Sequence, residues 1–204
     1  MVVSRKVISQ YRRWLSVPNP FSAALKRIEW YNRTTSARSK EIEKWKKPAW
    51  DAEKQVSSIA RRYQHGHSTF DNIRIPNPER KNGRGEVDVI LVTKRATVLI
   101  EVKHWKGQIC SYEDSNKELD IYQYGKKNEP VVSKLRKKCE MLRRMAVSRF
   151  SKPAGDVIPL VVLTHSRADL DERASRMGSV CSIKGSLSER TAKLHDYLES
   201  LLGH

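Results

Sequence analysis

Two acidic residues and one lysine interrupt the most apolar part of the sequence, the segment GEVDVILVTKRATVLIEVKHWKG. Asp88 lies inside the first apolar run, and Glu101 and Lys103 lie inside the second. Burying a carboxylate is costly unless it pairs with a cation or binds a metal. Two carboxylates can supply oxygen ligands to Mg²⁺, and a nearby lysine can orient or deprotonate a water. The set suggests metal-assisted phosphodiester hydrolysis; a salt bridge at a sheet end is the alternative.

The two apolar runs, residues 86–93 and 97–103, predict a pair of β-strands joined by a tight turn at KRA. Both runs are rich in Val and Ile, which favour strands. Side chains alternate between the faces of a strand, so Glu101 and Lys103 project from the same face. If the strands pair through the turn, Asp88 reaches that face as well. Such a hairpin would bring two carboxylates and one ammonium group together in the core sheet.

A helix is expected before this hairpin, in the segment WDAEKQVSSIARRY. Val56, Ala60 and Tyr63 recur there at spacings of four and three, which is typical of an amphipathic helix. Glu53 falls on the same stripe. A Glu at a helix start is usually a rim residue that the helix dipole stabilises. After the helix we expect a flexible polar loop at residues 65–67, followed by a short strand, TFDNIRI.

The hairpin segment GEVDVILVTKRATVLIEVKHWKGQI resembles the nuclease-related domain (NERD) family of the PD-(D/E)xK nuclease superfamily. In that family an Asp in one strand precedes Glu-Val-Lys in the next, and a Trp-x-Gly segment follows. The corresponding residues here are Asp88, Glu101-Val102-Lys103 and Trp105-Lys106-Gly107. The family also carries an acidic residue in the helix before the sheet, where this chain has Glu53. The resemblance covers roughly residues 50–149.

The resemblance implies a restriction-endonuclease-like core and a metal-dependent nuclease, with DNA favoured over RNA as the substrate. The expected catalytic residues are Asp88, Glu101, Lys103 and Glu53. The expected metal site, for Mg²⁺ or for Mn²⁺ in its place, comprises Asp88, Glu101 and Val102.

The chain carries 40 Lys and Arg against 23 Asp and Glu, a formal net charge of +17 that is spread over its whole length. This charge favours a polyanionic partner, most commonly nucleic acid, although an anionic membrane surface or a ribonucleoprotein would need it too. No stretch approaches the roughly 18 apolar residues of a transmembrane helix. The residues expected to contact nucleic acid are Arg84, His104, Lys106, Lys134, Arg136 and Lys137.

A second helix is expected after the sheet, in VVSKLRKKCEMLRRMAVSRF, with positions 132, 135, 139, 142 and 146 facing the core. Its outward residues are expected to be Arg136, Lys137, Lys138, Arg143 and Arg144. A merely solvated face does not require one sign of charge, so this face favours phosphate binding. At the start of this helix the chain departs from the family pattern: the family's Asn-Pro is Glu129-Pro130 here, and its Gln is missing, with Ser133 and Lys134 near that position.

The C-terminal part is expected to complete an α/β fold with a small mixed β-sheet flanked by helices. VIPLVVLTH predicts a core strand. SLSERTAKLHDYLESLLGH begins with a capping box, Ser186 and Glu189, and has an apolar face at positions 187, 191, 194, 198 and 201. We therefore expect a nuclease-related domain at residues 48–204, ending with a packing helix.

Residues 1–47 are expected to form a basic extension, with twelve Lys or Arg and no acidic residue before Glu29. The start, MVVSRKVISQYRRWLS, is amphipathic and Arg-rich, as mitochondrial transit peptides are; a basic arm that contacts phosphate or a partner is the alternative. Three widely spaced cysteines without a CxxC pair suggest reduced thiols. The expected location is intracellular: mitochondrial if the start is a transit peptide, otherwise cytoplasm or nucleus.

Three functions remain open from the sequence. The chain could be a metal-dependent nuclease, a nucleic-acid-binding module that keeps the fold without the chemistry, or a basic structural component of a ribonucleoprotein. The intact set of Asp88, Glu101 and Lys103 favours the nuclease. The sequence makes no prediction of oligomeric state.

Overall fold

The computed structural model describes residues 43–76, 84–113, 117–126, 130–150 and 155–203. The expected targeting segment lies outside these residues. The elements are α3 (Glu43–Arg61), β1 (Gly66–Pro76), β2 (Arg84–Thr93), β3 (Ala96–Lys103), β4 (Gly107–Glu113), β5 (Leu119–Gln123), α4 (Val132–Phe150), β6 (Asp156–Leu163), β7 (Ala168–Leu170), α5 (Glu172–Ser175), β8 (Val180–Ser182) and α6 (Leu187–Leu202). The expected division at residue 47 falls inside α3. Among the described helices, none is long and apolar enough to cross a membrane.

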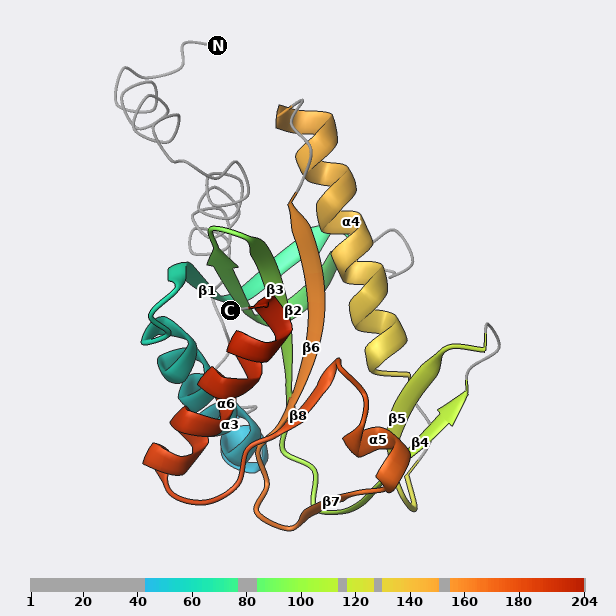
Figure 1. The fold of residues 1–204 in the computed structure, drawn as a ribbon. Coiled ribbons are helices and arrows are strands. Elements are labelled where there is room, and N and C mark those ends of the chain that lie inside the picture. The colour runs from blue at the N-terminus through green and yellow to red at the C-terminus, as the bar shows by residue number, and fades with distance from the viewer. Residues whose placement is uncertain (1–42, 77–83, 114–116, 127–129, 151–154, 204) are drawn as a thin grey trace.

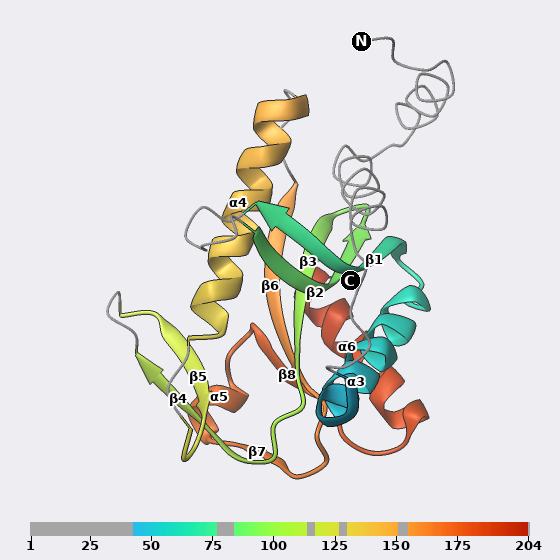
Figure 2. The same ribbon diagram turned by 180° about the vertical axis from the view of Figure 1, so that it is seen from behind.

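A five-stranded mixed sheet with the order β1-β2-β3-β6-β8 forms the centre of the fold. The β1–β2 and β2–β3 pairs are antiparallel, whereas β3–β6 and β6–β8 are parallel. Helix α4 covers one face of this sheet, and α3 and α6 cover the other (Figures 1 and 2). A smaller sheet of β5, β4 and β7 lies beside the N-terminal end of α4. The predicted α/β class, a small mixed sheet flanked by helices, is confirmed.

The central sheet separates two apolar cores. Ile90 and Leu99 pack on the side of α4, whereas Val89, Val98 and Ile100 pack on the side of α3 and α6. The predicted hairpin is confirmed, and its side chains alternate between the two cores from Val89 to Ile100; Val87, two residues before Val89, packs on the side of α4 instead. Because both faces are covered, β2 and β3 read as nearly continuous apolar runs. The charged residues in these runs lie just beyond the last β2–β3 backbone pair, Val89 and Ile100.

Helix α3 buries Val56, Ala60 and Tyr63, as predicted. The expected polar loop at residues 65–67 is wrong for its last two positions, because Gly66 and His67 already belong to β1. Strand β2 continues to Thr93, which pairs with Gly66, so β1 extends to the same end of the sheet. The His67 side chain remains exposed, so a polar residue is tolerated in this edge strand.

Helix α6 begins with the predicted capping box: Ser186 accepts from the Glu189 backbone, and Glu189 accepts from the Ser186 backbone. Its buried residues are Leu194, Leu198 and Leu202. The expected inward position of Leu187 is wrong, because this side chain is 50% exposed. Burial along α6 starts only at Leu194, so its first turns extend past the core.

Candidate active site

The carboxylate of Asp88 is held at the end of the β2–β3 hydrogen-bond ladder. Backbone pairing of these strands ends at Val89 and Ile100. At the next position Asp88 Oδ2 accepts a hydrogen bond of 2.7 Å from the backbone N–H of Val102. A side-chain oxygen thus takes the place of a backbone carbonyl where the two strands separate. This contact holds Asp88 against β3, next to Glu101.

Glu101 is held by two ammonium groups from different elements. Lys103 Nζ, on the same strand, donates to Glu101 Oε1 at 2.7 Å, and Lys138 Nζ, on α4, donates to Oε2 at 2.7 Å. The side chain of Glu101 is 15% exposed and that of Lys138 is 8% exposed. Each oxygen of the Glu101 carboxylate therefore accepts a hydrogen bond from one ammonium group, in a site that is largely shielded from water.

The position of Lys138 corrects an expectation. We expected its side chain on the outer face of α4, but it is buried and points to the sheet. Residues 135, 138 and 142 are three and four positions apart, so the helical period places Lys138 on the apolar stripe. The ion pair with Glu101 stabilises the buried charge. The other predicted inward residues with described side chains, Val132, Leu135, Cys139 and Leu142, are buried.

The pKa values of Asp88 and Glu101 are shifted in opposite directions. Burial, followed by the negative charge of Glu101, raises the pKa of Asp88 to about 7. The hydrogen bond from Val102 and the charge of Lys103 oppose this rise, whereas Glu53 on α3 adds to it. For Glu101, burial also favours the neutral acid, but Lys103 and Lys138 outweigh it and lower the pKa. Near neutral pH the site therefore holds one ionised carboxylate and one that exchanges its proton.

Lys103 stays cationic in this arrangement. Burial alone would lower its pKa, but attraction to Glu101, Asp88 and Glu53 raises it above the usual lysine value. The structure thus brings together three of the four residues that the sequence predicted as catalytic, Asp88, Glu101 and Lys103. The fourth, Glu53 on α3, is close enough for its charge to raise the pKa values of Asp88 and Lys103.

The predicted nucleic-acid contacts do not all gather at one place. Lys134 and Lys137 are exposed on the first turns of α4, and Arg136 pairs with Glu118. Lys106 is exposed directly after β3. His104 is half-buried, its Nδ1 lies 2.9 Å from Thr164 Oγ1, and its ring packs against His165. The side chain of Arg84, at the start of β2, lies outside the described side chains.

The donor set of Asp88 and Glu101 suits a hard divalent cation, because both supply carboxylate oxygens. The side chain of Val102 is buried in the opposite core, so only its backbone can contribute to this site. Within the described ranges, no three His, Cys, Asp or Glu side chains form a metal-binding cluster. Mg²⁺ commonly uses one or two carboxylates and completes its shell with waters and substrate phosphate. The residues present therefore fit such an ion only as a sparse, two-carboxylate site.

Asp120, on β5, positions α4 and with it Lys138. This carboxylate is fully buried. Its Oδ1 accepts from the backbone N–H groups of Ile121, Val131 and Val132 at 2.7 to 2.8 Å, and its Oδ2 accepts from Ser133 at 2.9 Å. Helix α4 has no acidic residue in its first turn. Asp120 therefore supplies from another strand the cap and the negative charge that a helix N-terminus favours.

We expect Asp120→Asn to lower the free energy of unfolding by about 2 kcal/mol, because the amide loses the charge and one of the two acceptor atoms. One of the α4 N–H groups would then remain unpaired in the core. Urea denaturation followed by circular dichroism measures the change. Asp196→Asn, on the exposed face of α6, is the matched control. Equal stability of the two variants would contradict this role of Asp120.

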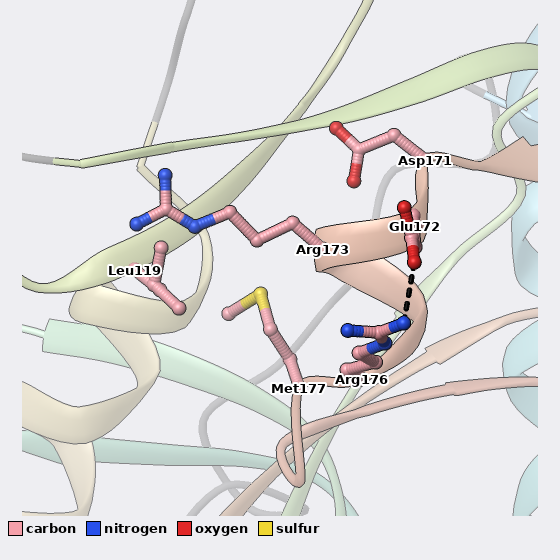
Figure 3. A pocket seen from close by; sticks show the side chains of 6 residues that line it. All are labelled: Leu119, Asp171, Glu172, Arg173, Arg176 and Met177. Carbon is pink, nitrogen blue, oxygen red and sulfur yellow. Dashed lines mark hydrogen bonds and ion pairs between the residues drawn. The ribbon is translucent and has the colours of Figure 1, made fainter.

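A pocket of about 460 Å³ lies beside α5, and neither Asp88 nor Glu101 lines it. Figure 3 shows its lining: Leu119, Asp171, Glu172, Arg173, Arg176 and Met177. The cations in it already have partners, because Arg176 pairs with Glu172 and Arg173 pairs with Glu113. None of the predicted site residues lines this pocket, so we assign the chemistry to the hairpin.

Comparison with known proteins gives one family. The family model described as the nuclease-related domain matches residues 48–164, which is more than half of the chain. The matched segment begins inside α3 and ends directly after β6. Among solved structures, the crystal structure of protein VC1899 from Vibrio cholerae is similar, with 16% sequence identity and a TM-score of 0.42. That alignment covers 75% of this chain and 33% of the other, so this chain spans about a third of its length. No curated protein matches the chain.

Proposed function

The chain belongs to the nuclease-related domain family of the PD-(D/E)xK nuclease superfamily, and from this we propose that it is a metal-dependent nuclease that hydrolyses phosphodiester bonds. One observation carries the proposal: Asp88, Glu101 and Lys103 meet at the end of one hairpin inside the matched region. The preference for DNA over RNA rests on the family resemblance. The net charge of +17 supports a nucleic-acid substrate.

In this proposal Asp88 and Glu101 hold Mg²⁺, or Mn²⁺ in its place, together with the backbone carbonyl of Val102. When bound, such an ion polarises the scissile phosphate and neutralises its charge. Lys103 orients the attacking water and offsets the charge that develops on the phosphate. Its raised pKa favours this role over that of a general base, because a base must first lose its proton. Glu53 stabilises the ammonium form of Lys103 from the site's edge.

A nucleic-acid-binding module without catalysis is the second candidate. It is favoured by the two lysines on Glu101, which neutralise this carboxylate without any metal. The two candidates differ in one respect, because binding alone depends on surface cations and needs neither Asp88 nor Lys103.

The test is to incubate the full chain with labelled single- and double-stranded DNA and RNA, with Mg²⁺, Mn²⁺ or a chelator. We expect cleavage only with the metal. At subsaturating Mg²⁺ the rate should rise with pH through about 7, because Asp88 must lose its proton to act as a ligand. A titration without metal should show affinity falling steeply with salt, since each neutralised phosphate releases counterions. Binding of every substrate without cleavage of any would favour the binding module.

A further inference from the structure

Lys138 donates to one of the two Glu101 oxygens that would serve as metal ligands. Its Nζ lies 2.7 Å from Glu101 Oε2, and Lys103 Nζ lies at the same distance from Oε1. We propose that Lys138 is the internal counter-cation of Glu101 in the free protein and transfers to a substrate phosphate, so that metal loading and nucleic-acid binding are coupled. This inference rests on the proposed nuclease function.

Charge balance supports the coupling. When both carboxylates are ionised, Asp88 and Glu101 contribute two negative charges, and Lys103 and Lys138 contribute two positive charges. These four groups are therefore neutral before a metal binds, and Glu53 adds one negative charge, which is less than the charge of a divalent cation. A divalent cation alone would leave an excess of positive charge in a shielded site, where like charges repel strongly. A phosphate offers the negative charge that both the cation and a displaced ammonium group require.

The structure also indicates which lysine moves. Lys103 is attracted by three carboxylates, those of Glu101, Asp88 and Glu53. The ion pair of Lys138 is with Glu101, and its side chain reaches that carboxylate from a different element, α4. Asp120 fixes the start of α4 through backbone hydrogen bonds. The helix can therefore stay in place while the four-carbon stem of Lys138 changes rotamer.

Metal binding without cleavage provides the first measurement. We expect Lys138→Gln to bind Mn²⁺ about tenfold more tightly than the wild type, measured by the electron paramagnetic resonance signal of free Mn²⁺ in the absence of nucleic acid. The glutamine amide can still donate to Glu101, but it carries no charge. Lys193→Gln, which removes one charge from the exposed side of α6, should bind Mn²⁺ like the wild type. Lys138→Arg should also stay close to the wild type, because it keeps the cation.

Reciprocity provides the second measurement. If DNA favours metal loading, the metal must tighten DNA binding by the same factor. Anisotropy of a labelled single-stranded DNA, with and without Ca²⁺ as an oxygen-preferring ion, should show about tenfold coupling in the wild type and much less in Lys138→Gln. Thermal melts verify that each variant is folded, and Lys138→Met replaces Lys138→Gln if the latter is not.

Two results would overturn the coupling. The first is that Lys138→Gln binds Mn²⁺ no more tightly than the wild type, and the second is that the coupling of metal and DNA persists in it unchanged. If the wild type still cleaves in either case, the nuclease proposal survives and only the role of Lys138 is lost. Absence of Mn²⁺ binding in every protein, with and without DNA, would remove both proposals.

Discussion

Replacement of Lys103 by alanine is expected to slow phosphodiester cleavage by about a hundredfold or more. Its ammonium group lies 2.7 Å from Glu101 Oε1 and is attracted by Asp88 and Glu53. These carboxylates hold it in one place and in its charged form. Alanine removes the group that orients the water and stabilises developing charge. The loss should appear in kcat, measured under single-turnover conditions with saturating Mg²⁺.

Affinity for nucleic acid should change little in the same variant, because exposed lysines and arginines elsewhere provide most of the phosphate contacts. Lys193→Ala, at an exposed position of α6 on the other face of the sheet, should cleave and bind like the wild type. Cleavage that survives Lys103→Ala would show that the hairpin is not the catalytic site. A parallel loss of binding and cleavage would instead assign Lys103 to substrate binding.

We expect Asp88→Asn to stabilise the metal-free protein by about 4 kcal/mol at pH 8, while removing cleavage that depends on Mg²⁺. Burial and the charge of Glu101 raise the pKa of Asp88 from 3.8 to about 7. The folded state therefore keeps a proton that the unfolded state loses near pH 4. Asparagine keeps an oxygen that can accept from Val102 but never ionises.

The raised pKa of Asp88 determines how the stability gained by Asp88→Asn depends on pH. A carboxyl group with a raised pKa in the folded state contributes stability that is fully present below pH 4 and is lost as the pH rises to about 7. The advantage of Asp88→Asn should therefore be absent near pH 4, grow up to pH 7 and remain constant above it. Urea denaturation at several pH values, with a chelator present, measures this difference. An advantage that is the same at every pH, or that also appears in Asp196→Asn, would contradict the assignment.

The hairpin could be predicted from sequence because its information is local. Alternation along two adjacent apolar runs is sufficient to place Asp88, Glu101 and Lys103 on one face, and a short turn determines the pairing. Helix α3 and the cap of α6 were predicted for the same reason. The family resemblance then identified Glu53, which alternation in the strands could not have connected to the site.

Residues whose role depends on distant partners were missed. Lys138 was assigned to the outer face of α4 from its charge, although its spacing from Leu135 already placed it on the inner face. Asp120 was missed because it caps a helix that begins twelve residues later, without a local signal. The strands β7 and β8 have only three residues each, which is too short for a periodic pattern in the sequence. Strand β8 is recognised by its pairing with β6.

The contacts between α3 and α6 determine when the protein can fold during synthesis. Arg190 donates to Gln55, and His195 contacts the carbonyl of Ile59, across 135 and 136 positions of the chain. A ribosome therefore completes the β2–β3 hairpin long before the helix that covers the apolar side of α3 emerges. Contacts between such distant segments form slowly. In the nascent chain, Asp88, Glu101 and Lys103 are consequently present before the core between α3 and α6 is complete. Val56 and Ile59 stay accessible to chaperones until α6 has been made.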